Sequence, residues 1–356
     1  MEVRIKDSIT SIRVTFDIND VLQLLKPSRR FIENSFDNFQ LDPKFPSQEI
    51  AKDQAILFAQ SIVNSDLGQL RYHKWQWHSH QRKIHGDIAK TSLYIDGTFG
   101  VGKTHLLAAI YNEISDEKVF VSFVNLVNIV GALGLEATVQ HLSKVRLVAI
   151  DEFELDDPGE TVLISTLLER LSENPMSIIA TSNTTPTKLG IGRFSSTDFM
   201  REIQGLGARF EVIHLEGLDH RTILARRLGI VVEDGYILNK LASIPQRVSF
   251  DPFDVVNDCL SNIHPVMYQK LILNFDAIVI SFREPIDSLF SALRFVVLVD
   301  RAYEMEKPLL TVGLKIDEIF AVDLLRGGFA MKFGRCISRL FQLRIEANEL
   351  FGMGTM

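Results

Sequence analysis

The stretch Asp96-Gly-Thr-Phe-Gly-Val-Gly-Lys-Thr104 determines the fold that the sequence predicts. Its segment GTFGVGKT matches the phosphate-binding loop pattern in full. The apolar run Ser92-Leu-Tyr-Ile-Asp96 precedes it, and the helix-like run His105-Leu-Leu-Ala-Ala-Ile110 follows it. A strand before the loop and a helix after it are the context that this motif requires. We therefore predict an α/β P-loop NTPase with a parallel sheet flanked by helices.

The residue types of the loop explain how it would bind a nucleotide. Its glycines let the backbone turn tightly, so that successive N–H groups and the start of the next helix face the β-phosphate. Lys103 would bring a positive charge to the β- and γ-phosphates, and the Thr104 hydroxyl would coordinate Mg²⁺. ATP and Mg²⁺ are thus the expected cofactors. The predicted nucleotide-binding residues are Gly97, Thr98, Phe99, Gly100, Val101, Gly102, Lys103, Thr104 and His105.

A second motif, Val145-Arg-Leu-Val-Ala-Ile-Asp-Glu-Phe153, is an apolar strand that ends in two carboxylates. Behind a phosphate-binding loop this is the Walker B arrangement. Asp151 would hold Mg²⁺ directly or through water, and Glu152 would polarise the attacking water as general base. The acidic residues that follow are predicted to lie in a solvated turn and to cap a helix from Thr161 to Leu171; they are Glu154, Asp156 and Asp157.

The next predicted strand, Ser177-Ile-Ile-Ala-Thr-Ser-Asn183, ends in polar residues that would lie beside Walker B. Asn183 there can orient the lytic water or contact the γ-phosphate, the role called sensor 1 in AAA+ ATPases. Arg209, followed by Phe210, stands where AAA+ proteins commonly carry the arginine finger that reaches a neighbouring subunit's γ-phosphate. Arg193 and Arg201 are competitors for that role. The predicted catalytic residues are Glu152, Asn183, Arg209 and Arg193.

Composition and charge exclude several classes of protein. The 356 residues carry a net charge of −7, and the shares of hydrophobic (46%) and charged (23%) residues are ordinary for a soluble globular chain. This acidic balance argues against binding nucleic acid over the whole surface. Cys259 and Cys336 lack metal-ligand spacing and are expected to be reduced core thiols. With a charged N-terminus and no long apolar span, the protein is expected to be cytoplasmic.

Three parts are predicted along the chain: an N-terminal segment over residues 1–47, an AAA+ ATPase core over 48–230, and a C-terminal α/β region with lid-like helices over 231–356. In the core we expect helices from Gln48 to Asn64, Lys103 to Ile114, Leu126 to Leu133 and Leu135 to Leu142, with a strand from Val119 to Val124. In the C-terminal region we expect strands from Asp276 to Phe282 and Pro308 to Val312, a helix from Ser288 to Glu304, and helices beginning near Asp317 and Ala330.

Two further features leave alternatives open. Arg335 and Arg339 lie one turn apart on the last predicted helix, where they would contact nucleotide phosphate as sensor 2 does, or form a surface pair. The segment from Arg71 to His85 holds both tryptophans and four of the nine histidines, which suits a nucleic-acid stacking surface or a metal site. Because neither has the spacing of a known motif, a surface insertion is the preferred prediction.

Together these motifs resemble the ZapE family of AAA+ ATPases, whose mitochondrial relatives are the lactation-elevated-type ATPases. The matches extend from about Phe36 to Leu343, nearly the whole chain, although His220 stands where tyrosine is usual. They include Asp151-Glu-Phe-Glu-Leu-Asp-Asp-Pro158, Ala180-Thr-Ser-Asn183 followed by Pro186, Gly217-Leu-Asp-His-Arg221, Leu293-Arg-Phe-Val-Val-Leu-Val-Asp300 and Ile337-Ser-Arg-Leu340. The forms of Phe123-Val-Asn-Leu-Val-Asn-Ile-Val-Gly-Ala-Leu-Gly134 and Gly190-Ile-Gly-Arg-Phe194 are most similar to actinobacterial members.

The resemblance implies an ATPase that acts on FtsZ polymers at the bacterial division site, whereas the mitochondrial relatives are tied to turnover of membrane-complex subunits. It implies homo-oligomers in which an arginine finger acts in trans on the neighbouring subunit. Because some members lack an arginine at the Arg209 position, Arg193 is the other candidate for this finger. The usual roles are implied for Lys103, Asp151, Glu152 and Asn183. We therefore predict Mg²⁺-dependent ATP hydrolysis coupled to remodelling of FtsZ or another protein substrate in cell division. No nucleic-acid partner is expected, and contact with membrane-associated machinery would be peripheral at most.

Two other classes of function share part of this pattern. A helicase-loader-like ATPase would also have the loop and Arg209-Phe210, and would use the segment from Arg71 to His85 on single-stranded DNA. A nucleotide-gated binding module with negligible turnover would keep Lys103. Glu152 argues against the second class, because binding alone needs no general base.

Overall fold

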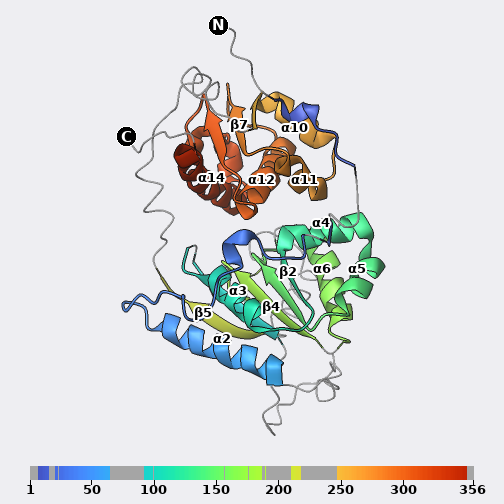
Figure 1. Ribbon diagram of the computed structural model, residues 1–356, viewed down its shortest axis with the longest axis vertical. Coiled ribbons are helices and arrows are strands. Elements are labelled where there is room, and N and C mark those ends of the chain that lie inside the picture. Colours follow the sequence, from blue (N-terminus) through green and yellow to red (C-terminus); the bar gives the residue numbers. More distant parts are fainter. Residues whose placement is uncertain are drawn as a thin grey trace. The chain divides into compact units, whose positions relative to one another are not determined.

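The structure is a computed structural model, and the residues that it describes are 7–15, 21–22, 24–64, 92–98, 100–155, 157–174, 176–186, 189, 210–217 and 247–350. The chain divides into two compact units (Figure 1). The P-loop unit comprises Leu24–Pro27 and Phe31–Asp219. The C-terminal unit comprises Met1–Gln23, Ser28–Arg30 and His220–Met356, so the first part of the chain contributes to both units.

The P-loop unit is built on a parallel sheet with the strand order β2-β3-β4-β1-β5. Its strands are β1 (Ser92–Gly97), β2 (Lys118–Ser122), β3 (Leu147–Asp151), β4 (Ser177–Ser182) and β5 (Glu211–Leu215). Every residue of β1, β3 and β4 is buried, which explains why these strands are mostly apolar rather than alternating. The predicted parallel sheet is confirmed, and β4 lies between the strand that leads into the loop and the strand that ends at Asp151.

Helices cover both faces of this sheet (Figure 1). On one face, α2 (Ser47–Asn64) and α3 (Lys103–Glu113) form a core with strand residues such as Leu93 and Ile95. Tyr94 points to the opposite face, where its ring contacts Phe153 (centroids 6.3 Å apart), and Phe153 contacts Phe123 at the start of α4 (5.2 Å). Three helices pack together there: α4 (Phe123–Leu133), α5 (Leu135–Leu142) and α6 (Pro158–Leu171).

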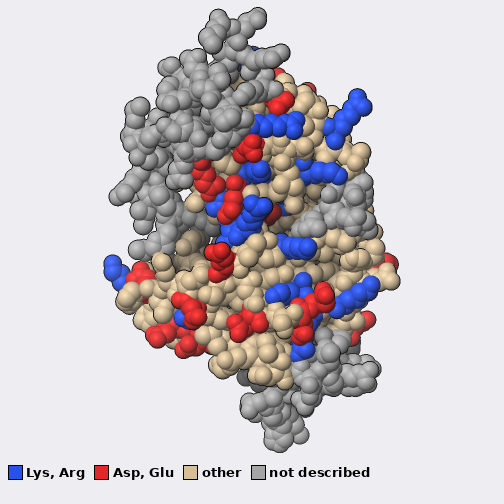
Figure 2. Space-filling model, viewed as in Figure 1, with Lys and Arg blue, Asp and Glu red and all other residues tan. Residues whose placement is uncertain are grey.

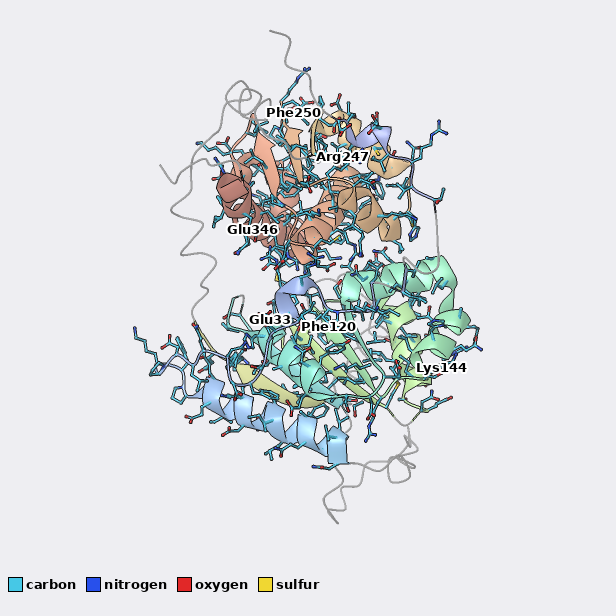
Figure 3. The ribbon with its side chains drawn as sticks, viewed as in Figure 1. Glu33, Phe120, Lys144, Arg247, Phe250 and Glu346 are labelled. Carbon is cyan, nitrogen blue, oxygen red and sulfur yellow. The ribbon has the colours of Figure 1, made fainter. Side chains whose placement is uncertain are left out.

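The core on the α3 side extends to the edge strand β2. The ring of Phe120, labelled in Figure 3, lies against Tyr111 of α3 (centroids 5.6 Å apart) and stacks on Phe31 (6.0 Å). The backbone N–H of Phe120 also donates to the carbonyl of Leu25 at 3.0 Å. The segment that precedes α2 is thereby attached to the outer strand of the sheet.

The C-terminal unit has a parallel sheet of its own, with the order β6-β7-β8. Its strands are β6 (Val248–Pro252), β7 (Ala277–Ser281) and β8 (Leu309–Val312), and its helices are α10 (Phe253–Ser261), α11 (Tyr268–Leu273), α12 (Leu289–Glu304), α13 (Val322–Arg326) and α14 (Ala330–Leu350). Ile278 and Ile280 of β7 face a large core that includes residues of α10, α11, α12 and α14. Ala277 and Val279 face the other side of the sheet, so both faces of β7 are buried.

The edge strand β6 was not predicted, because Val248-Ser-Phe-Asp-Pro252 mixes apolar residues with an acid and a proline. The first part of the chain explains its formation. Asp251 is 3% exposed and accepts hydrogen bonds from the N–H of Ile9 (2.8 Å) and the hydroxyl of Ser8 (2.6 Å). Pro252 is tolerated since it ends an edge strand, where no ladder donor is needed.

Of the two alternatives for the last helix's arginines, the surface pair is wrong. Arg335 and Arg339 of α14 are only 3% and 5% exposed, and both pair with the carboxylate of Asp300 on α12. The guanidinium of Arg339 also lies 5.0 Å from the ring centroid of Tyr303, and Arg30 lies over the same ring at 4.2 Å. Charge pairing and stacking on an aromatic ring offset the cost of burying these cations.

Glu346 lies on α14 and is labelled in Figure 3. Its carboxylate forms a further ion pair with Arg30. The Nε of Arg30 also donates to the carbonyl of Tyr303 at 2.8 Å. One arginine from the early part of the chain thus contacts both the end of α12 and the last helix.

Most predicted elements are confirmed, with shifts at their ends that have local causes. The strand expected from Val119 to Val124 stops at Ser122, because the Ser122 hydroxyl accepts from the N–H of Asn125 and caps α4. The helix expected from Asp317 is a short 3₁₀ turn, Ile316–Glu318, followed by α13. Of the two cysteines, Cys336 is buried as predicted and Cys259 is only partly buried.

Within the described ranges, no single helix is both long and apolar enough to cross a membrane. The helices α4 and α5 pass that test only as a pair bent by 120°.

Replacing Asp300 with Asn is expected to destabilise the protein by about 3 to 5 kcal/mol, because the buried Arg335 and Arg339 would lose the carboxylate that both contact. Urea denaturation measures the change. The matched control is Glu318→Gln, since the Lys315–Glu318 pair is half exposed at 50% and 52%. That variant should stay within about 1 kcal/mol of wild type; equal losses for the two variants would contradict the role assigned to Asp300.

Candidate nucleotide-binding site

The predicted loop joins β1 to α3 at the carboxyl edge of the sheet. Gly97, Gly100 and Gly102 all have positive φ, at 153°, 72° and 99°. A Cβ at Gly97 would lie 2.2 Å from the carbonyl oxygen of Leu215, and one at Gly102 would lie 2.7 Å from the ring of Phe39. Only glycine suits both the backbone conformation and the space. Because α3 begins directly after Gly102, the N–H groups of its first turn lie at the loop.

Lys103 connects the loop with the neighbouring strand β4. Its ammonium group donates to the carbonyl oxygens of Gly97 (2.9 Å) and Thr98, and to Oδ1 of Asn183 (2.9 Å). The side chain is 8% exposed, so hydrogen bonding to polar partners offsets the cost of burying its charge. The structure thus brings together the predicted loop lysine and the predicted sensor residue.

Asp151 lies next to Thr104 at the same edge. Its Oδ1 accepts from the hydroxyl of Thr104 at 3.0 Å and from the hydroxyl of Thr181 at 2.5 Å. The Thr181 oxygen in turn accepts from the backbone N–H of Glu152 at 3.0 Å. Thr181 therefore fixes both Walker B residues, a role that was not predicted. Its signal in the sequence is weak, since it is one hydroxyl in the polar end of a buried strand.

Glu152 has an unusual backbone conformation, with φ of 57°. Residues other than glycine rarely adopt this left-handed region, and such strain persists only where surrounding contacts enforce it. Those contacts come from β4, because the N–H of Glu152 donates to the Thr181 hydroxyl and the N–H of Phe153 donates to the Thr181 carbonyl (2.6 Å). The turn after β3 is thus held in place by the strand beside it.

Glu154 does not lie in a solvated turn, and that prediction is wrong. Its side chain is 3% exposed, and it accepts a hydrogen bond from Nδ2 of Asn183 at 2.6 Å. Asp157 behaves as expected, because its carboxylate accepts from the N–H of Glu160 and caps α6. Glu154 differs from Asp157 in burial because both of its neighbours in the chain, Phe153 and Leu155, are fully buried.

The segment before α2 packs along α3 and against the loop. His105, the third residue of α3, contacts the carbonyl oxygen of Ser35 through Nε2 (3.0 Å) and meets the ring of Phe39 (centroids 5.3 Å apart). Gln48 is 5% exposed; its side chain accepts from the N–H of Asp42 at 2.8 Å and donates to the carbonyl of Glu216 at 2.9 Å. This segment therefore forms one wall beside the loop.

Two polar contacts of β1 lie next to the loop. Nδ1 of His214 on β5 contacts the carboxylate of Asp96, which is 2% exposed. Tyr94 donates its hydroxyl to the carbonyl of Thr184 at 2.9 Å. Burial raises the pKa of Tyr94, which keeps the phenol protonated and able to donate.

Several predicted residues lie outside the described part of the chain. They are Phe99, Arg193, Arg201, Arg209, His220 and the segment from Arg71 to His85. The choice between Arg193 and Arg209 as arginine finger stays a prediction.

The residues present fit a magnesium ion. The Thr104 hydroxyl and the Asp151 carboxylate are oxygen ligands, which Mg²⁺ prefers, and they lie within 3.0 Å of each other. Among the described residues, no group of three or more His, Cys, Asp or Glu side chains forms a metal cage. That agrees with the usual way of binding Mg²⁺, through one or two protein ligands completed by water and phosphate.

A comparison with models of protein families shows which family the chain belongs to. The model of the AFG1-like ATPase family matches residues 22–232 and 240–349. The chain belongs to the AFG1-like ATPase family. The resemblance predicted from the motifs is thereby confirmed at the level of the family, and the P-loop unit of this AFG1-like protein has the expected parallel sheet flanked by helices.

A comparison of the AFG1-like chain with curated protein sequences finds no match. Among solved structures, DnaI is 19% identical, with 54% of this chain and 92% of that chain covered and a TM-score of 0.40. AMPPCP-bound DnaA from Aquifex aeolicus is 16% identical, with 61% and 60% covered and a TM-score of 0.37. Such low identities and TM-scores say nothing about the function of this chain.

Replacing Thr181 with Val is expected to lower the rate of ATP turnover about tenfold or more. The change removes the hydroxyl that aligns Asp151 and Glu152, and small displacements of reacting groups cost rates of that order. Steady-state phosphate release measures it. Thr181→Ser keeps the hydroxyl and should keep most of the rate; a Val variant as fast as the Ser variant would contradict the alignment role.

Proposed function

We propose that this AFG1-like protein is a Mg²⁺-dependent ATPase that couples ATP hydrolysis to remodelling of a protein partner. The observation that carries the proposal is the meeting of four side chains at one edge of the sheet. Lys103 and Asn183 contact each other at 2.9 Å, and Thr104 and Asp151 contact each other at 3.0 Å, beside a glycine loop and a helix N-terminus. In P-loop ATPases, groups of these kinds hold the phosphates and Mg²⁺ and contact the lytic water.

Binding of ATP follows from the loop. The N–H groups at the start of α3 would receive the β-phosphate, and Lys103 would exchange its backbone partners for phosphate oxygens. Thr104 and Asp151 would hold Mg²⁺, which neutralises phosphate charge when bound. Two further residues of the predicted nucleotide site are Val101, on the loop, and His105, in the first turn of α3.

Hydrolysis would depend on Glu152 as general base. Glu152 directly follows β3, and its backbone N–H donates to the Thr181 hydroxyl, which supports a position of its carboxylate near the phosphates. Asn183 would act next to it on the water or on the γ-phosphate. An arginine from a neighbouring subunit, Arg209 or Arg193, would stabilise the transition state in trans, which requires a homo-oligomer.

The partner is proposed to be FtsZ polymers in cell division, as the resemblance to ZapE implies. The alternative partner is another protein substrate. Contact with membrane-associated machinery would be peripheral. A cytoplasmic location fits this role. On the face seen in Figure 2, basic and acidic side chains of the described residues are interspersed, which supports a protein partner better than a nucleic acid.

Glu152→Gln is expected to bind ATP normally and to hydrolyse it at least a hundredfold more slowly, because the amide cannot take a proton from water. Equilibrium binding of ATP and phosphate release together test this. Lys103→Ala is the contrasting variant and should lose binding as well. Turnover by Glu152→Gln equal to wild type would remove Glu152 from the mechanism.

The partner is tested by comparing ATP turnover of the protein alone, with FtsZ polymers and with single-stranded DNA. We expect stimulation by FtsZ and none by DNA, since a remodelling ATPase turns over faster on its substrate. Stimulation by DNA alone would replace the proposal with a helicase-loader-like function, and the segment from Arg71 to His85 would then be the DNA-binding candidate.

A further inference from the structure

Glu154 is a buried acid for which the ATPase mechanism has no assigned role. Its side chain is 3% exposed, and both neighbours in the chain, Phe153 and Leu155, are 0% exposed. Burying a carboxylate in such surroundings is costly unless it is hydrogen-bonded. From the candidate nucleotide site, Nδ2 of Asn183 donates to this carboxylate at 2.6 Å.

The two partners of Asn183 set the orientation of its amide independently. Lys103 has only N–H groups to offer, so the atom that it contacts at 2.9 Å must be the amide oxygen. On its other side, the Asn183 amide nitrogen donates to Oε1 of Glu154. Both contacts fit the same orientation, with the oxygen toward the loop.

We propose that Glu154 is a positioning residue that fixes the Asn183 amide with its oxygen facing Lys103 and the phosphate site. This inference rests on the proposed ATPase function. It favours one of the two roles open to Asn183: with its nitrogen turned to Glu154 and its oxygen toward Lys103, Asn183 presents an acceptor to the phosphate site, which suits orienting the lytic water. Before ATP arrives, the same oxygen holds Lys103.

The first test is Glu154→Met, which removes the acceptor and keeps a side chain of similar length. We expect kcat for ATP hydrolysis to fall about tenfold or more, since a loosened Asn183 no longer aligns the water. The KM for ATP should not rise, because Lys103 is held less firmly by Asn183. Glu154→Gln is the matched control; its side-chain oxygen accepts the same hydrogen bond, so most of kcat should remain.

A polarity swap tests the contact itself. Asn183→Asp sets a second carboxylate against Glu154 and should lower both kcat and the urea midpoint of unfolding. Adding Glu154→Gln to that variant supplies an N–H₂ donor for the new carboxylate. The double variant should recover about tenfold in kcat and most of the lost midpoint, a non-additivity that residues in contact show.

The outcomes separate this inference from the proposed function. If wild type hydrolyses ATP and Glu154→Met has the same kcat, the inference is overturned while the ATPase function stands. If adding Glu154→Gln does not restore the urea midpoint of unfolding that Asn183→Asp lost, the inference is also overturned. This result does not depend on whether the protein turns over ATP. A wild type without turnover overturns the proposed function, and the positioning role with it.

Discussion

The nucleotide site depends on the arrangement of parallel strands with their carboxyl ends at one edge. β4 lies between β1 and β3, so the polar ends of the three strands meet although they are far apart in the sequence. The buried ammonium group of Lys103 then joins the loop to β4, and the Thr181 hydroxyl joins β4 to β3. Each contact satisfies a polar group that burial would otherwise destabilise, and the network therefore fixes the site before nucleotide binds.

Backbone strain and close approach occur at this same edge. Three glycines of the loop have positive φ, and Glu152 adopts a left-handed conformation although it is not glycine. Such conformations persist only where neighbours enforce them, and here β4 supplies the hydrogen bonds to the Glu152 and Phe153 N–H groups. The central strand β4 is therefore as important for the geometry of this edge as the two motifs that flank it.

The C-terminal unit is stabilised by its own core and by charges that it buries. Its β7 strand is covered on both faces, and α12 and α14 bring Asp300, Arg335 and Arg339 together out of solvent. The early part of the chain completes this unit, since Ser8 and Ile9 satisfy Asp251 on β6. This unit is thus a second α/β body and not a purely helical lid.

The sequence alone determined the parallel α/β fold of the P-loop unit, the loop from Gly97 to Thr104 and the pairing of an apolar strand with Asp151 and Glu152. These features are local, because glycine spacing, apolar runs and strand-end carboxylates carry them directly. Only tertiary structure decided which polar residues are buried. Glu154 and Arg335 look like surface residues in the sequence, and their burial depends on Asn183 and Asp300 from distant segments, which supply the partners that an isolated charge lacks in a core.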